Sequence, residues 1–228
     1  MSFSRTLLQR AQSYIDAQVK KPFLQGLING DLPTACFEYW LRVDYPYLFN
    51  FLKVLSLGVV KADDPQDIWV MLDHMRAIQE EMQDHQKHAA KLGLTHDDLI
   101  NNKMGPLKYS YTRHQLSAAY QGPIGDVQAS ILACQWGYGA AARTLLREKP
   151  LQPDNPYKDW FAFHAAERHL DSLNLSLDLL DRQAAKSTEE QKAHMERIFM
   201  TSVEHETMLW DEYYNMTQWE SYPLAEAL

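Results

Sequence analysis

The stretch from residue 123 to residue 146, PIGDVQASILACQWGYGAAARTLL, decides the fold class. It begins with a proline, which suits the first turn of a helix, and its apolar residues recur every three or four positions. Gly137 and Gly139 lie inside it, although a glycine costs a helix about 1 kcal/mol relative to alanine. We therefore expect a ligand or a second helix to approach this backbone closely. The predicted inward face carries Val127, Ile131, Cys134, Tyr138, Ala141 and Leu145.

Helical periods continue through the rest of the chain, and no alternating run is long enough for a strand. We expect Gly30 and Gly58 to end helices and Pro46 to kink the long helix that contains it. The pattern predicts an all-α fold, a single-domain helical bundle over residues 1–228 with a frayed tail beyond Tyr222. The predicted helices cover residues 3–20, 23–29, 34–57, 64–92, 97–101, 107–120, 123–146, 157–185 and 187–219.

Composition excludes several classes of protein. The 228 residues carry a net charge of −8 and no basic block, which argues against nucleic acid as a main partner. Two cysteines do not make a disulfide framework in a chain of this length, and the first residues lack the apolar core of a signal peptide. No apolar run is long enough to cross a bilayer. We expect a soluble, cytoplasmic protein without a membrane partner.

Polar side chains interrupt the apolar faces of four predicted helices. Asp44 falls in the middle of one stripe and Glu206 in another, and a buried carboxylate without partners costs several kcal/mol. Nothing near Asp44 in the sequence pairs with it, so its partner must come from another helix or from a ligand. With Tyr111, Cys134 and Tyr138 on inward faces, this set could bind a nitrogen heterocycle and carry out acid–base and nucleophilic chemistry on it.

A metal site is the competing interpretation of the polar residues. Nine histidines are present, but no Glu-x-x-His pair of the kind that di-iron helical bundles use. Glu81 and His88 are the one possible metal pair on a helix face, so we predict no metal and no other cofactor. We expect the following histidines to be surface or helix-cap residues: His85, His88, His164, His169, His194 and His205.

Five motifs in order resemble the TenA family, the thiaminase II or aminopyrimidine aminohydrolase proteins with a haem-oxygenase-like helical fold. The resemblance covers nearly the whole chain, although Gln135 replaces the proline that usually follows the family's cysteine. The matching segments are Phe37-x-x-Trp40-Leu41-x-x-Asp44-Tyr45-x-Tyr47-Leu48, Tyr109-x-Tyr111-Thr112, Cys134-x-Trp136-x-Tyr138, Tyr157-x-x-Trp160 and Glu206-x-x-x-Trp210-Asp211.

The resemblance implies a role for each site residue. Cys134 would add to a ring carbon of an aminopyrimidine, and Glu206 would protonate the amine or thiazolium that leaves the neighbouring CH2. Water would then give hydroxymethylpyrimidine, as thiamin salvage requires. Tyr111 and Tyr138 would orient this pair. Three further residues would bind substrate: Asp44 the amino-pyrimidine edge, Tyr47 a face of the ring, and Phe163 as a residue of the pocket wall.

Two positions depart from the family and bear on the substrate. Phe163 stands where a tyrosine commonly lines the pocket, and Leu209 stands where a phenylalanine usually precedes the tryptophan. Losing a hydroxyl or a ring could loosen substrate choice. The resemblance also implies a homotetramer acting on an aminopyrimidine or on thiamin. The alternatives are a non-catalytic ligand-binding or regulatory protein of the same fold and, with less support, a metal-dependent oxygenase.

Overall fold

The computed structural model describes residues 1–220 as ten α-helices, with no strand among them. The predicted frayed tail beyond Tyr222 lies outside the described residues. None of the described helices is both long and apolar enough to cross a membrane. The helices are α1 (Phe3–Gln18), α2 (Pro22–Asn29), α3 (Thr34–Lys61), α4 (Pro65–Lys91), α5 (His96–Ile100), α6 (Pro106–Gln121), α7 (Ile124–Glu148), α8 (Lys158–His164), α9 (Glu167–Ala185) and α10 (Glu189–Asn215).

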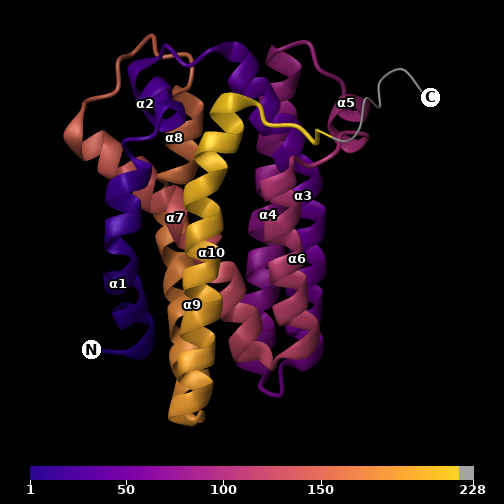
Figure 1. Ribbon diagram of the computed structural model, residues 1–228, viewed down its shortest axis with the longest axis vertical. Helices are drawn as coiled ribbons and strands as arrows, with labels where there is room; N and C mark the ends of the chain where they lie inside the picture. The colour runs from indigo at the N-terminus through magenta and orange to yellow at the C-terminus, as the bar shows by residue number, and fades with distance from the viewer. Residues whose placement is uncertain (221–228) are drawn as a thin grey trace.

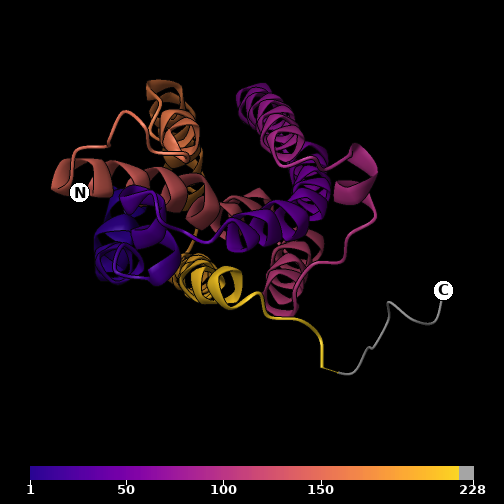
Figure 2. The same cartoon turned by 90° about the horizontal axis from the view of Figure 1, so that it is seen from above.

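The long helices form two groups that stand side by side (Figure 1). One group is α3, α4 and α6, and the other contains α1, α9 and α10. Helix α7 joins them, because it packs against α10, α9, α6 and α3 and crosses between the groups in the view from above (Figure 2). Its inward residues, among them Val127, Ile131 and Ala141, are fully buried. The predicted all-α bundle is confirmed, with the glycine-containing stretch at its centre.

Local signals fix several helix ends as the sequence predicts. Gly30 caps α2 in the left-handed conformation at φ 82°, which a residue without a Cβ adopts without strain. Thr188 caps α10 in a capping box, its hydroxyl accepting a hydrogen bond from the Gln191 amide at 3.2 Å. Pro46 lies inside α3, as the sequence predicts, and the helix continues on both sides of it.

Three predicted boundaries are wrong. Helix α3 continues through Gly58 to Lys61, and a Cβ at Gly58 would lie 2.7 Å from the Met71 sulfur, so this glycine lets α4 approach rather than ending α3. The helix expected over 157–185 is two helices, because Ala166 is extended at ψ 145°. Alanine favours helix, so packing overrides local propensity there. Helix α10 ends at Asn215, where Met216 adopts the left-handed conformation.

Candidate active site

Asp44 of α3 is 3% exposed, and both of its oxygens have partners from other helices. Oδ1 lies 2.6 Å from the Lys108 ammonium of α6, and Oδ2 lies 3.0 Å from Nε2 of His85 on α4. Burial raises the pKa of Asp44, but Lys108 and His85 more than compensate and hold it well below its usual range. The expectation that Asp44 is satisfied from a distant part of the chain is confirmed.

Lys108 is one of the site residues that the sequence reasoning missed. Its side chain is fully buried, and its ammonium lies 3.8 Å from the centre of the Tyr47 ring. Burial lowers the pKa of Lys108, but the Asp44 and Glu206 carboxylates raise it above its usual value, so the side chain is a cation. A signal was present, because Lys108 precedes Tyr111 by three residues and so shares its inward face.

Cys134 of α7 and Glu206 of α10, the two residues predicted to carry out the chemistry, lie next to each other. Cys134 is only partly exposed, and burial, with the nearby Glu206 and Glu81 carboxylates, raises its pKa well above the usual value. Glu206 is 2% exposed, and burial raises its pKa to about 7 in spite of the Lys108 cation. At neutral pH the free site therefore contains a neutral thiol beside a carboxyl group that is ready to gain or lose a proton.

Tyrosines surround this pair. Tyr47 and Tyr111 stack with ring centres 5.7 Å apart. Both lie near Cys134, which adds to the effect of burial in raising the pKa of each tyrosine. Tyr138 lies one turn after Cys134, with its hydroxyl 3.3 Å from that of Tyr213. Burial raises the pKa of each of these tyrosines, so their hydroxyls stay protonated.

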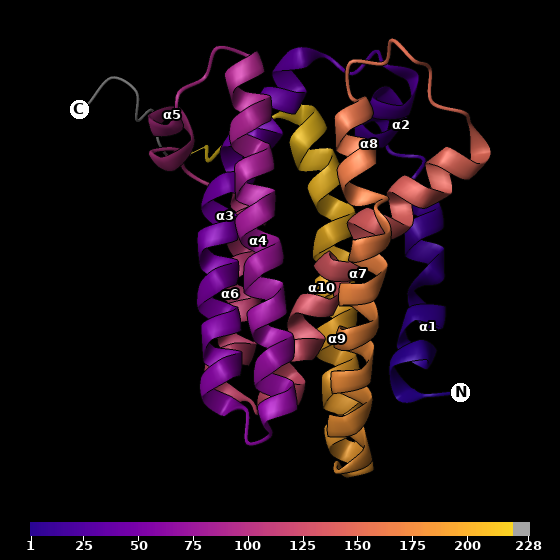
Figure 3. The ribbon, with the colours of Figure 1, turned by 180° about the vertical axis from the view of Figure 1, so that it is seen from behind.

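A cavity opens beside Cys134, on the side of the molecule where α4 and α9 face each other (Figure 3). Of the five polar residues predicted on inward helix faces, Cys134 and Tyr138 line this cavity, whereas Asp44, Tyr111 and Glu206 are buried and are not part of its lining. The remaining polar lining is Glu81, His74, His164, His169, Gln135 and Ser172.

The polar lining of the cavity is largely uncharged at neutral pH. Burial lowers the pKa of His74 and of His169 to about 4, and that of His164 well below its usual value. Burial, with Asp44 nearby, raises the pKa of Glu81 to about 7. The cavity thus offers neutral imidazoles and one carboxyl group that is about half protonated at neutral pH. Such a lining suits an aromatic nitrogen heterocycle.

The histidine prediction is wrong for three residues. His85, His88 and His164 are 1%, 6% and 4% exposed, and each belongs to the interior around the site. The prediction used only the usual preference of histidine for the surface. These three side chains are buried because they contact residues from distant parts of the chain. His85 pairs with Asp44, and His164 packs against the Tyr138 ring at 5.1 Å between centres. His194 is a surface residue, as expected, with 53% of its side chain exposed.

Phe163 does not line the cavity but packs behind it. Its ring meets His164 at 5.0 Å and His169 at 4.8 Å edge-on, and those two imidazoles face the cavity. Arg168 lies over the Phe163 ring at 5.2 Å. Phe163 therefore supports two of the histidines that line the cavity. Leu209 is fully buried in the core.

One group of possible metal ligands occurs among residues 1–220, formed by Asp44, Glu81 and His85 with one ligand atom of each within 4.8 Å of the others. Lys108 already supplies a cation to Asp44 at 2.6 Å. A metal ion there would meet this ammonium and would compete with it for the same carboxylate. The set therefore suits a lysine-compensated carboxylate better than a metal, and the absence of a metal stays a prediction.

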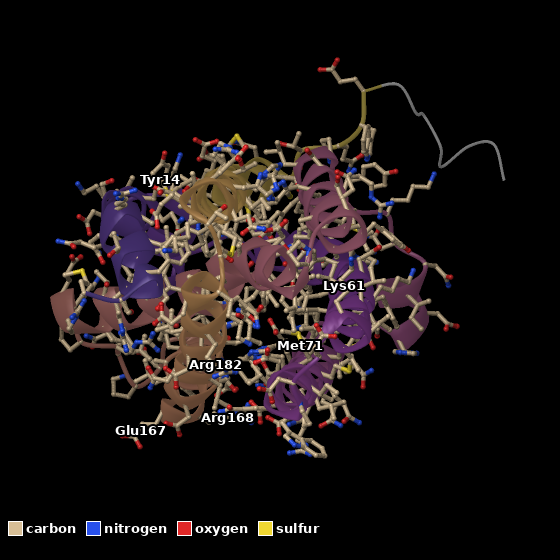
Figure 4. All side chains as sticks on the ribbon, turned by 90° about the horizontal axis from the view of Figure 1, so that it is seen from below. Tyr14, Lys61, Met71, Glu167, Arg168 and Arg182 are labelled. Atoms are coloured by element: carbon tan, nitrogen blue, oxygen red, sulfur yellow. The ribbon has the colours of Figure 1, made fainter. Side chains whose placement is uncertain are left out.

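A second cleft lies between α4 and α9, next to the cavity, and polar side chains of the two helices pair with each other on this side of the molecule. Arg182 donates to Asp67 at 2.5 Å, Ser172 donates to Asp73 at 2.8 Å, and Arg168 pairs with Glu80. Figure 4 labels Arg168 and Arg182 on α9, facing the helix that carries Met71. His169 and Ser172 line both this cleft and the cavity, so the two hollows adjoin each other between these two helices.

Fold and site together define a class of protein, the helical bundles with the haem-oxygenase-like fold. A TenA homologue from Pyrococcus furiosus superimposes with a TM-score of 0.84 at 22% identity, covering 93% of this chain and 100% of that one. A domain with a heme oxygenase-like fold from Shewanella denitrificans has a TM-score of 0.71 at 13% identity, covering 93% and 92%.

The family follows from the sequence comparison. The model of the TENA/THI-4/PQQC family matches residues 8–216, and the chain belongs to this family. A relative from Helicobacter pylori named aminopyrimidine aminohydrolase is 31% identical over 94% of this chain and 99% of its own length. A relative of the same name from Halalkalibacterium halodurans is 29% identical over 96% and 98%.

Proposed function

We propose that this protein is an aminopyrimidine aminohydrolase of the thiaminase II type. It hydrolyses an aminomethylpyrimidine, or thiamin itself, to hydroxymethylpyrimidine. The observation that carries the proposal is Cys134, which reaches the cavity while Glu206 lies beside it with a pKa of about 7. Full-length similarity to proteins named aminopyrimidine aminohydrolase supports the same conclusion.

The reaction starts with the Cys134 thiol, because burial keeps it protonated. As sulfur adds to the ring carbon next to the substituted one, its proton passes to the Glu206 carboxylate, and the ring electrons move to a ring nitrogen. Protonated Glu206 then gives its proton to the leaving amine as the C–N bond breaks. Water adds to the exposed methylene, Glu206 accepts the proton of that water, and expulsion of the thiolate restores the aromatic ring.

The surrounding residues position these two. Tyr111 and Tyr47 pack beside Cys134 and Glu206 and keep bulk water from the buried side of the pair. Tyr138 and His164 present ring faces to the cavity from the other side. An aromatic substrate is favoured there, since ring pairs contribute about 0.5–1.5 kcal/mol beyond the area they bury.

We further propose that the chain acts as one domain, in the cytoplasm, as a homotetramer without metal. The tetramer rests on family membership, and the expectation of no metal rests on the absence of a Glu-x-x-His pair from the sequence.

Turnover of aminomethylpyrimidine tests the proposed function. The purified protein should release ammonia and hydroxymethylpyrimidine in equal amounts, and treatment with a chelator should leave the rate unchanged. Binding of the pyrimidine without any ammonia release would instead support a non-catalytic ligand-binding protein. Stoichiometric iron or manganese in active preparations, with loss of activity on chelation, would overturn the prediction that the protein needs no metal.

A further inference from the structure

We propose that the side-chain amide of Gln135 recognises the leaving group of the substrate by donating a hydrogen bond to an oxygen atom on it. The hydroxyethyl group on the thiazolium ring of thiamin carries such an oxygen. This inference rests on the proposed function and narrows the substrate to aminopyrimidines whose leaving group carries a hydroxyl. Its basis is the surroundings of Gln135, which stands where the family usually has a proline.

The side-chain oxygen of Gln135 is held from two sides. Nε2 of Gln128, two turns earlier on α7, and the hydroxyl of Ser176 on α9 each donate to it at 2.9 Å. These two donors define how the amide is oriented, because an amide nitrogen cannot accept a hydrogen bond. Nε2 of Gln135 is buried and has no hydrogen-bond partner within residues 1–220. A buried donor left unpaired costs about 1–3 kcal/mol, and an acceptor on a ligand can remove this cost.

Gln135 lies on the side of Cys134 from which a leaving group can depart. Both residues line the cavity. The cavity adjoins the second cleft at Ser172, and the partner of Gln135, Ser176, lies one turn after Ser172 on α9. The family resemblance assigns the pyrimidine edge to Asp44, which is buried and outside the cavity lining. With the ring held there, the group on its methylene lies in the cavity beside Gln135.

His74 of α4 supplies an acceptor next to this donor. The Ser176 hydroxyl donates to the Gln135 oxygen at 2.9 Å and to the Ser172 carbonyl oxygen at 3.2 Å, so it has no proton left for Nε2 of His74 at 2.8 Å. His74 therefore donates from Nε2, and its Nδ1 is an acceptor. Burial lowers the pKa of His74 to about 4, which keeps the ring neutral at pH 7. Because His74 also lines the cavity, the two residues match a hydroxyl group, which both accepts and donates.

Steady-state rates on two substrates test the assignment. The substrates are thiamin and its analogue in which an ethyl group replaces the hydroxyethyl group. The wild-type protein should prefer thiamin by about tenfold or more in kcat/KM, the scale for a buried polar group left unpaired. Gln135→Met keeps the length of the side chain but removes the donor, so the preference should fall to about twofold or less.

The control is Gln12→Met, an exposed glutamine of α1, which should keep the full preference. A Gln135→Met protein that loses kcat/KM equally on both substrates, and so keeps the preference, would overturn the assignment and give Gln135 a merely structural role. Equal rates of the wild type on both substrates, or hydrolysis of aminomethylpyrimidine without hydrolysis of thiamin, would also overturn it while leaving the proposed function intact. Hydrolysis of neither aminomethylpyrimidine nor thiamin would reject the proposed function itself.

A structure of the Cys134→Ser protein with bound thiamin decides the matter if Gln135→Met does not fold. The inference predicts the hydroxyl oxygen of thiamin within about 3.2 Å of Nε2 of Gln135. A hydroxyethyl group directed away from Gln135 would show the assignment to be wrong.

Discussion

Lys108 sets the charge balance of the whole site. It is fully buried, contacts Asp44, and lowers the pKa of Glu81, Glu206 and Cys134 from a distance. One buried cation thus lowers the pKa of three carboxyl groups and of a thiol. Burial raises the pKa of Glu81 and of Glu206 to about 7 in spite of this cation, so both remain able to exchange protons. The division between one fixed carboxylate and two adjustable ones follows from where this ammonium lies.

Removing the Lys108 charge should therefore be costly. Lys108→Met keeps the length of the side chain but leaves Asp44 with His85 alone, so we expect the free energy of unfolding to fall by about 3–5 kcal/mol. Urea denaturation at pH 7 measures this, with Lys53→Met on the exposed side of α3 as the matched control. Equal stability of the two variants would show that the Lys108–Asp44 pair does not hold the site together.

The raised pKa of Glu206 predicts the pH dependence of stability. A carboxyl group with a folded pKa of about 7, above its unfolded value of 4.5, stabilises the fold in its protonated form. That contribution is complete below pH 4.5 and is lost as the pH rises through 7. Glu206→Gln, which stays neutral, should remove a loss of order 3 kcal/mol between pH 4.5 and 8. Urea titrations of both proteins across this range should diverge in that direction; parallel curves would contradict the prediction.

At the scale of helices, α10 organises the site twice over. This helix carries Glu206 beside Cys134. Six residues later it carries Glu212, whose side chain contacts the first turn of α6. The Glu212 carboxylate accepts hydrogen bonds from the backbone amides of Leu107 at 2.7 Å and Lys108 at 3.2 Å. The first turn of α6 has no N-cap side chain of its own, so Glu212 takes that part and thereby fixes the backbone of Lys108.

Loss of this cap should weaken both stability and the site. Glu212→Ala should lower the free energy of unfolding by about 1–2 kcal/mol, the usual worth of a cap, and raise KM by more than it lowers kcat. Glu204→Ala, an exposed position on the same helix, is the control. Thermal unfolding beside steady-state kinetics measures the effect, and a Glu212→Ala protein as stable as the control would count against the capping role.

Helical phase was enough to predict the parts of the fold and the site that depend on local pattern. The positions of Asp44, Cys134 and Glu206 on inward faces follow from three- and four-residue spacing. The break between α8 and α9 leaves no local signal, because Ala165 and Ala166 are good helix formers and the change of direction is imposed by packing.

The partners within the site could not be predicted from the sequence. Lys108 and Asp44 are far apart along the chain, and nothing in either neighbourhood marks them as a pair. The same holds for His85, whose burial reflects its bond to Asp44. Glu81 has charged neighbours in α4, so the sequence alone suggests a surface glutamate, whereas the structure places it in the lining of the cavity. Long-range electrostatic pairing is a property of the folded arrangement.

At the scale of the whole molecule, the cavity opens between two helices that are bridged mainly by polar contacts. A second copy of the chain could support these helices, and we predict the homotetramer implied by the family. Light scattering of the purified protein at micromolar concentration should give four times the chain mass of 26.5 kDa. A monomer under those conditions would reject the prediction.

The most direct test of the account compares the two cysteines of the chain. Cys134 reaches the cavity, whereas Cys36 is buried elsewhere with its sulfur 3.2 Å from the Tyr214 carbonyl oxygen. Ammonia release from aminomethylpyrimidine is measured for the wild type, Cys134→Ser and Cys36→Ser, with binding of hydroxymethylpyrimidine measured by calorimetry. Cys134→Ser should lose at least about 10³-fold in kcat while still binding the pyrimidine, and Cys36→Ser should turn over normally. Near-normal turnover by Cys134→Ser would contradict covalent catalysis at this site.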